Sequence, residues 1–141
     1  MRPPDWSADG AVFAVVGAGN NLSAGFVAMR ATLGGPVGVF RAPTNSCFIQ
    51  QSAWSGPHYL VMLTGPECGQ TTLDGRLVVL DRQARVEAEY VVGRKAFFVP
   101  STDGHWVASA TGGGWQFIQL DAPNARIVVP LGGTLDGWCC P

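Results

Sequence analysis

Residues 5–10 of the chain read DWSADG, and residues 99–104 read VPSTDG. The serine, aspartate and glycine of the first stretch recur 94 residues later in the second, and an apolar run follows each stretch. An Asp-Gly pair favours a turn, because glycine accepts a positive φ angle and aspartate hydrogen-bonds to its own backbone. The two stretches therefore predict equivalent units, each a turn followed by a strand, near the two ends of the chain.

A third copy of this unit is expected halfway between them, near residue 53. Residues 53–56 read AWSG and precede the apolar run 57–62, but this copy lacks the Asp-Gly pair and is two residues shorter. Further along, residues 77–81 resemble residues 117–121, whereas the first copy matches poorly there. Because a fixed period indicates a repeat architecture, we predict a single domain, 1–141, with repeats near 1–47, 48–94 and 95–141.

The repeats are predicted to consist of strands. Glycine (19) and proline (10) recur along the whole chain, so its elements must be short. Between Ala84 and Tyr90 apolar and charged residues alternate, which places the apolar set on one face of a strand. We therefore predict an all-β protein with about four antiparallel strands per repeat. Recognisable strands lie at residues 11–16, 26–31, 37–41, 59–63, 77–81, 84–90, 106–110, 115–120 and 126–129.

The pattern Trp-Ser-x-Asp-Gly before a short strand resembles the blades of TolB-type β-propellers, which belong with the tryptophan-aspartate-like repeats. The match is full at residues 6–10, partial at 101–104 and limited to Trp54-Ser55 in the middle copy. Similar blades occur in peptidases of the prolyl oligopeptidase class. The resemblance implies three propeller-type blades, a scaffold or binding role and, for TolB-like proteins, a periplasmic location. A β-sandwich or another barrel is the alternative fold.

Three blades pose a problem of closure, because propellers typically contain four to eight blades. Open sheet edges carry unpaired backbone groups and invite pairing with another chain. Three outcomes fit: a fragment of a longer propeller, two copies that complete six blades, or docking on a larger partner. We expect a protein partner or self-association through the open blade edges, and an isolated chain that is not a well-behaved monomer.

The cysteines are candidates for a disulfide. Four cysteines permit three pairings, and no Cys-x-x-Cys is present to suggest a zinc site. Cys68 lies in a turn-rich segment, where an exposed free thiol would be a liability. Cys47 with Cys68 is the leading pairing, since repeats 1 and 2 are neighbours. Cys139 and Cys140 are adjacent and could pair only in a strained ring, or one could reach another blade; four reduced thiols remain the alternative.

No motif predicts catalysis, a metal or a cofactor. There is no Gly-x-Ser-x-Gly elbow, and residues 101–105 contain serine, aspartate and histidine only as sequence neighbours. Residues 17–21 lack the third glycine of a dinucleotide-binding loop. His58 and His105 fall near the same point of their repeats, and we expect no nearby carboxylate or cysteine partner for them, so we assign them to packing. The five tryptophans are likewise assigned to packing, with sugar stacking as the alternative.

Charge and hydropathy restrict the function further. Charged residues are only 13% of the chain, and the nine basic residues are scattered, which argues against a nucleic-acid surface. No apolar run is long enough for a membrane span, and residues 1–6 lack the apolar core of a signal peptide. We predict a non-enzymatic protein-interaction or scaffold module, an accessory subunit of a larger complex, in the periplasm or outside the cell. The alternatives are part of a peptidase propeller or a carbohydrate-binding module.

Overall fold

The computed structural model describes residues 2–20, 23–35, 38–66, 68, 74–93, 97–111, 114–121 and 126–130. Within these residues all regular secondary structure is β-strand, and twelve strands form three antiparallel sheets of four. The predictions of an all-β protein and of four antiparallel strands per repeat are therefore confirmed. In the same part of the chain there is no helix with the length and apolar character needed to cross a membrane.

Each sheet is a meander whose strands follow one another in chain order. Sheet 1 contains β1 (Asp5–Trp6), β2 (Val12–Gly17), β3 (Phe26–Ala31) and β4 (Gly38–Arg41). Sheet 2 contains β5 (Phe48–Ser55), β6 (His58–Thr64), β7 (Asp74–Leu80) and β8 (Val86–Gly93). Sheet 3 contains β9 (Phe98–Pro100), β10 (Trp106–Thr111), β11 (Gly114–Gln119) and β12 (Arg126–Val129).

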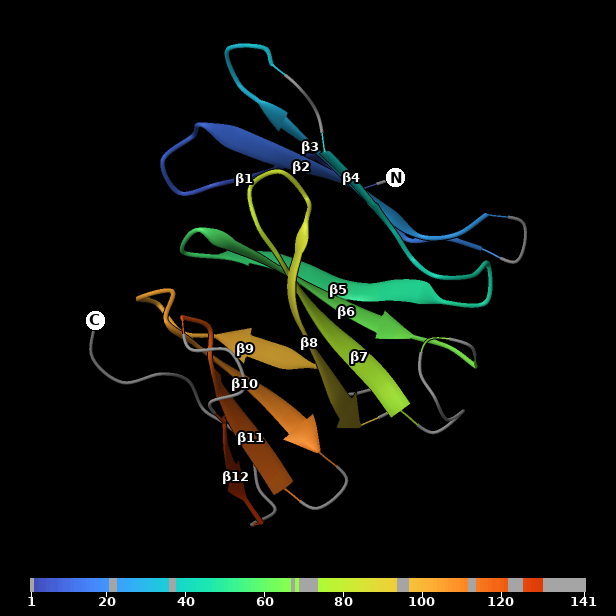
Figure 1. Cartoon of the computed structure of the whole chain (residues 1–141), viewed down its shortest axis with the longest axis vertical. Coiled ribbons are helices and arrows are strands. Elements are labelled where there is room, and N and C mark those ends of the chain that lie inside the picture. The colour runs from blue at the N-terminus through green and yellow to red at the C-terminus, as the bar shows by residue number, and fades with distance from the viewer. Residues whose placement is uncertain are drawn as a thin grey trace.

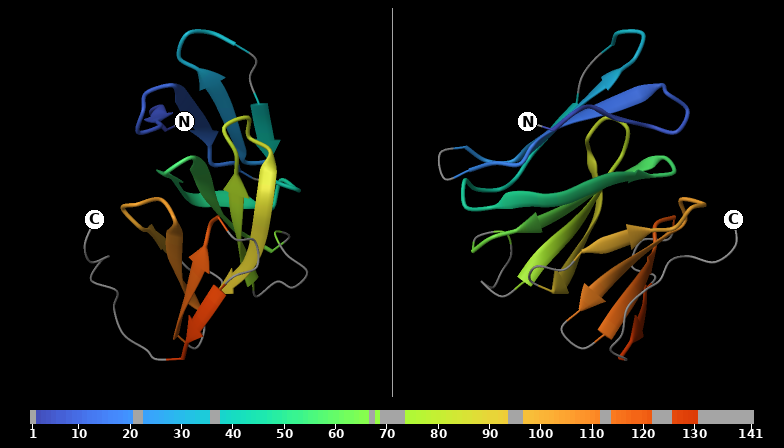
Figure 2. Two further views of the ribbon diagram at one scale, coloured as in Figure 1. Left: turned by 60° about the vertical axis from the view of Figure 1, so that its left-hand side comes forward. Right: turned by 180° about the vertical axis from the view of Figure 1, so that it is seen from behind.

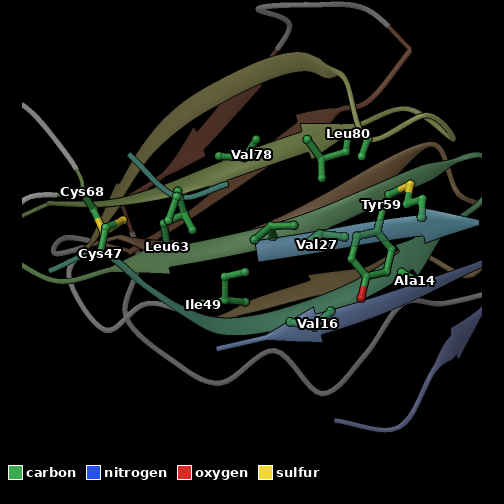
Figure 3. Packing of buried hydrophobic residues seen from close by; sticks show 14 of the residues in the cluster. Ala14, Val16, Val27, Cys47, Ile49, Tyr59, Leu63, Cys68, Val78 and Leu80 are labelled. Carbon is green, nitrogen blue, oxygen red and sulfur yellow. A yellow bond between two sulfur atoms is a disulfide. The ribbon is translucent and has the colours of Figure 1, made fainter. Parts of the chain in front are cut away.

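The sheets are stacked face to face, with sheet 2 between sheets 1 and 3 (Figure 1, Figure 2). Tyr59, Val61 and Leu63 of β6 pack against sheet 1, while Leu60 and Met62 pack against sheet 3. Figure 3 shows Tyr59 and Leu63 within the first of these two cores. All five side chains are at most 2% exposed. Burial on both faces explains why β6 reads as a continuous apolar run, since alternation appears only where one face meets water.

The stack has a direction. Val12, Ala14 and Val16 of β2 face sheet 2, and Leu60 and Met62, at corresponding positions of β6, face sheet 3. We call the side of a sheet that points toward the next sheet along the chain its front face, and the other side its back face. The front of sheet 1 packs on the back of sheet 2, and the front of sheet 2 on the back of sheet 3. The described sheets form an open stack, and no other described sheet covers the back of sheet 1 or the front of sheet 3.

The serine and aspartate of the repeated stretch form the turn between the first two strands of sheets 1 and 3. Ser7 Oγ donates a hydrogen bond to Asp9 Oδ1 at 2.7 Å and accepts one from the Val12 backbone N–H at 3.1 Å. In sheet 3 Ser101 and Asp103 repeat these bonds at 2.6 and 3.0 Å. The matching bonds confirm that residues 5–10 and 99–104 are equivalent turn units.

Sheet 2 has a shorter version of the same turn. Ser55 pairs directly with His58 across a two-residue loop, two residues shorter than in the other sheets, as the sequence predicts. Without an aspartate in this loop, the buried Ser55 hydroxyl has no hydrogen-bond partner in the part of the chain that the structure describes.

This difference between the turns predicts unequal effects of removing the serine hydroxyl. Ser101→Ala should lower the free energy of unfolding by about 1 kcal/mol, because the Trp106 backbone N–H loses its acceptor. Ser55→Ala should leave stability unchanged or raise it, because a buried hydroxyl without a partner is itself destabilising. Urea denaturation of both variants checks the difference. Equal losses would contradict it.

The first strand of each sheet is not recognisable in the sequence. Strand β1 has only two residues, β9 ends in a proline, and β5 contains polar residues and a bulge between Ile49 and Gln51. The alternating run predicted over residues 84–90 also begins later in the structure. Ala84 lies in the turn before β8 and has a φ of 60°, so it does not continue the strand.

Candidate functional site

The back face of sheet 1 is an apolar, aromatic surface. Trp6 packs on Phe13 with ring centroids 4.9 Å apart, and Trp6 remains 52% exposed. Phe26 lies over Gly17 in the neighbouring strand, where a Cβ atom would come within 2.3 Å of the ring. Val39 of β4 is 49% exposed on the same face. The back-face residues that the ladder places together are Trp6, Phe13, Val15, Phe26, Ala28 and Val39, with Arg30 and Arg41.

The front face of sheet 3 also carries aromatic and apolar side chains. Phe97 meets Trp115 edge to face at 5.5 Å and is 50% exposed. Ile127 of β12 is 57% exposed and is paired with Phe117 on this face. Trp106 lies on the same side of β10 and is partly buried. The two ends of the stack thus carry partly exposed aromatic and apolar side chains that no other described sheet covers.

Two histidines and two carboxylates meet where sheets 2 and 3 adjoin. His58 Nδ1 lies 2.6 Å from Glu87 Oε2, and His58 Nε2 lies 3.3 Å from Asp121 Oδ1. The other Asp121 carboxylate oxygen is hydrogen-bonded to His105 Nδ1. The expectation that these histidines lack carboxylate partners is therefore wrong, because the stacking of the sheets brings together residues that are distant in sequence. The cluster borders a cavity of about 280 Å³.

The geometry of this cluster suits a bridge between sheets better than a reactive centre. His58 is 9% exposed, and each of its two ring nitrogens lies within hydrogen-bond distance of a carboxylate oxygen. Neither nitrogen is left for a substrate proton or a metal ion. Among the residues that the structure describes, no group of three or more His, Cys, Asp or Glu is placed to hold a metal.

The contacts of Asp121 make stability depend on pH. The hydrogen bond that His105 donates to the Asp121 carboxylate raises the pKa of His105 above 6.5, and hydrogen bonds donated by His105 and then by His58 lower the pKa of Asp121 below 3.8. The stabilisation from His105 is complete below its unfolded pKa and is lost as pH rises through its raised folded pKa. That from Asp121 is present above 3.8 and is lost as pH falls through its lowered folded pKa.

We therefore predict that His105→Asn reduces the loss of stability that accompanies a rise in pH above 6.5. Free energies of unfolding measured across pH for the wild type and the variant check this. His105 and Asp121 are surface groups, so the difference should shrink in high salt. Identical pH profiles for the two proteins would contradict the prediction.

The disulfide predicted between Cys47 and Cys68 is present, with Cα atoms 4.9 Å apart. By the predicted bounds, the bond joins the last residue of repeat 1 to repeat 2. Cys47 directly precedes β5 and Cys68 follows β6, so the bond closes one end of the first hairpin of sheet 2. Both residues are buried, and Figure 3 shows the bridge at the end of the core between sheets 1 and 2. Cys139 and Cys140 lie outside the described residues.

The four tryptophans that the structure describes do not gather into one surface. Trp54 is partly buried between sheets 1 and 2, where its Nε1 donates to the Asp5 carbonyl at 2.9 Å. Trp6 lies on the back of sheet 1, whereas Trp106 and Trp115 belong to sheet 3. Trp138 lies outside the described residues. The described strands therefore do not place these tryptophans together as one sugar-binding platform.

Side chains also fix the sheets to one another. Gln51 of β5 exchanges two hydrogen bonds with the backbone of Phe98, at 2.8 and 2.9 Å. Arg82, in the turn after β7, reaches Asp9 in the first turn of sheet 1 at 2.7 Å. These contacts link sheet 2 to sheet 3 and sheet 1 to sheet 2 through polar side chains, in addition to the apolar cores.

Comparison of the chain with protein-family models, curated proteins and solved structures finds no match. The class that the fold itself defines is an all-β protein of three stacked four-stranded sheets.

Proposed function

We propose that the chain is a protein-interaction module that binds a protein partner through the back face of sheet 1. The observation that supports this most directly is that Trp6, which packs on Phe13, remains 52% exposed on the same face as Val39, which is 49% exposed. An aromatic group that is only half covered is typical of an interface centre, where tryptophan and tyrosine are enriched. Arg30 and Arg41 add a charged margin to the same face, and arginine is also frequent at interfaces.

The compartment and the propeller-type organisation belong to the same proposal. A disulfide persists in oxidising surroundings, so the Cys47–Cys68 bond supports a periplasmic or extracellular location. Three four-stranded meanders with a common front-to-back direction are consistent with blades of a β-propeller. The His58 cluster links sheets 2 and 3, and both ring nitrogens of His58 are engaged in that link, so we do not assign it a catalytic role. We assign the chain a scaffold role, as the accessory subunit of a larger complex.

Site-specific photo-crosslinking tests the proposed function. A photoreactive phenylalanine analogue is introduced at Val39 on the back face and, as a control, at Leu33, which is 99% exposed in the turn before β4. We expect defined protein adducts from position 39 and none from position 33 in cells that produce the protein. The absence of adducts at position 39, or equal adducts at both positions, would overturn the proposal.

A further inference from the structure

We infer that the partner of the back face of sheet 1 is the front face of sheet 3 in a second copy of the chain. The inference rests on the proposed function and names the occupant of its surface. Two copies joined in this way make two identical contacts, from sheet 3 of each copy to sheet 1 of the other, and so close a ring of six sheets.

Within one chain, the front of a sheet packs on the back of the next sheet twice. The side chains in these two contacts indicate which residues a contact between two copies would use. The back of sheet 2 presents Tyr59 and Val61, which are fully buried against the front of sheet 1. At the corresponding ladder positions the back of sheet 1 presents Phe13 and Val15. Aromatic and β-branched residues thus occupy the same places on both back faces, but only those of sheet 2 lie beneath another described sheet.

The front faces of sheets 1 and 3 can be compared at equivalent ladder positions in the same way. Ala14, at the front of sheet 1, lies beside the ring of Tyr59 (Figure 3). Ala108 occupies the equivalent position at the front of sheet 3, next to the positions of Trp106 and Phe117 in the ladder. Ala108 is already buried within one copy, so the side chains that this face exposes toward Phe13 of a second copy are those of Phe97 and Ile127.

Symmetry selects two copies. A front-to-back contact joins two different surfaces, and such contacts close only when the rotation from copy to copy completes a circle. Propellers close with four to eight blades. The described residues of one copy supply three four-stranded sheets, so two copies supply six and three copies supply nine, and of these numbers only six lies in that range. A closed pair also leaves neither end face exposed.

The experiment measures the mass of the purified wild-type chain by light scattering after size-exclusion chromatography. We expect twice the mass of one chain. Phe13→Glu on the back of sheet 1 and Ile127→Glu on the front of sheet 3 should each give monomers. Leu33→Glu, in an exposed turn outside both faces, should remain a dimer. If Phe13→Glu fails to fold by circular dichroism, Val39→Glu replaces it on the same face.

Mixing the two monomeric variants tests the direction of the contact. In a mixed pair, one contact joins the intact front of sheet 3 to the intact back of sheet 1, while the other contains both substitutions. Energy transfer between differently labelled variants should therefore appear in the mixture and be absent from either variant alone. No transfer in the mixture would overturn the front-to-back contact.

The outcomes separate this inference from the proposed function. A wild-type monomer overturns the inference, and position 39 adducts with a different protein then leave the proposed function standing. A wild-type monomer without adducts overturns both. Adducts of twice the chain mass, together with a wild-type dimer, support both.

Discussion

Loss of the Cys47–Cys68 disulfide is expected to lower the free energy of unfolding by about 3 kcal/mol. The bond joins residues 21 positions apart, and a crosslink of this span restricts the unfolded chain substantially. Alanine is the suitable replacement at both sites, because both cysteines are buried and serine would bury a hydroxyl. Urea denaturation of Cys47→Ala/Cys68→Ala against the oxidised wild type measures the loss.

Reduction of the wild type serves as the control. The reduced wild type and the double variant should unfold at similar urea concentrations, because both lack the crosslink. Cys139→Ala/Cys140→Ala, treated with and without reductant, shows whether the effect belongs to the first pair. A double variant as stable as the oxidised wild type would show that packing alone holds the end of the hairpin where β5 begins and β6 ends.

The turn chemistry explains why the sequence predicts the arrangement of strands well. Ser7 and Asp9, and again Ser101 and Asp103, make their defining hydrogen bonds within a few residues, so their spacing is visible in the chain. The shorter loop after Ser55 is visible for the same reason. The first strand of each sheet is harder to predict because its position depends on distant contacts. Gln51, a polar residue inside β5, is held there by the backbone of Phe98 in the next sheet.

The candidate sites depend on contacts between sheets, which local patterns do not contain. Glu87 is 29 residues from His58, and Asp121 is 63 residues from it. An interpretation based on sequence neighbours assigns the histidines to packing and misses both carboxylates. The apolar back face of sheet 1 is similarly hidden, because Phe13 and Val15 alternate with buried residues and resemble a core strand. Only the order of the sheets shows which apolar face lacks a described neighbour.

Gly104→Ala should be far more destabilising than Gly10→Ala, although the two glycines occupy equivalent turns. Both have positive φ angles, 77° and 68°, so each alanine carries a backbone strain of about 1 kcal/mol. A Cβ atom at Gly104 would also lie 2.6 Å from the Cα atom of Gly56, whereas at Gly10 it would meet nothing within 4 Å. Overpacking of this kind typically adds about 1–3 kcal/mol.

The difference between the variants isolates the close contact between the turns of sheets 2 and 3. Gly56 and Gly104 meet backbone to backbone, so neither side chain rotation nor a flexible neighbour can relieve the clash. Urea denaturation should place the free energy of unfolding of Gly104→Ala about 2–4 kcal/mol below that of the wild type and about 1 kcal/mol below it for Gly10→Ala. Equal losses would mean that the two turns can separate without cost. The stacking of sheet 3 on sheet 2 would then rest on its other contacts, chiefly the buried side chains around Leu60 and Val107.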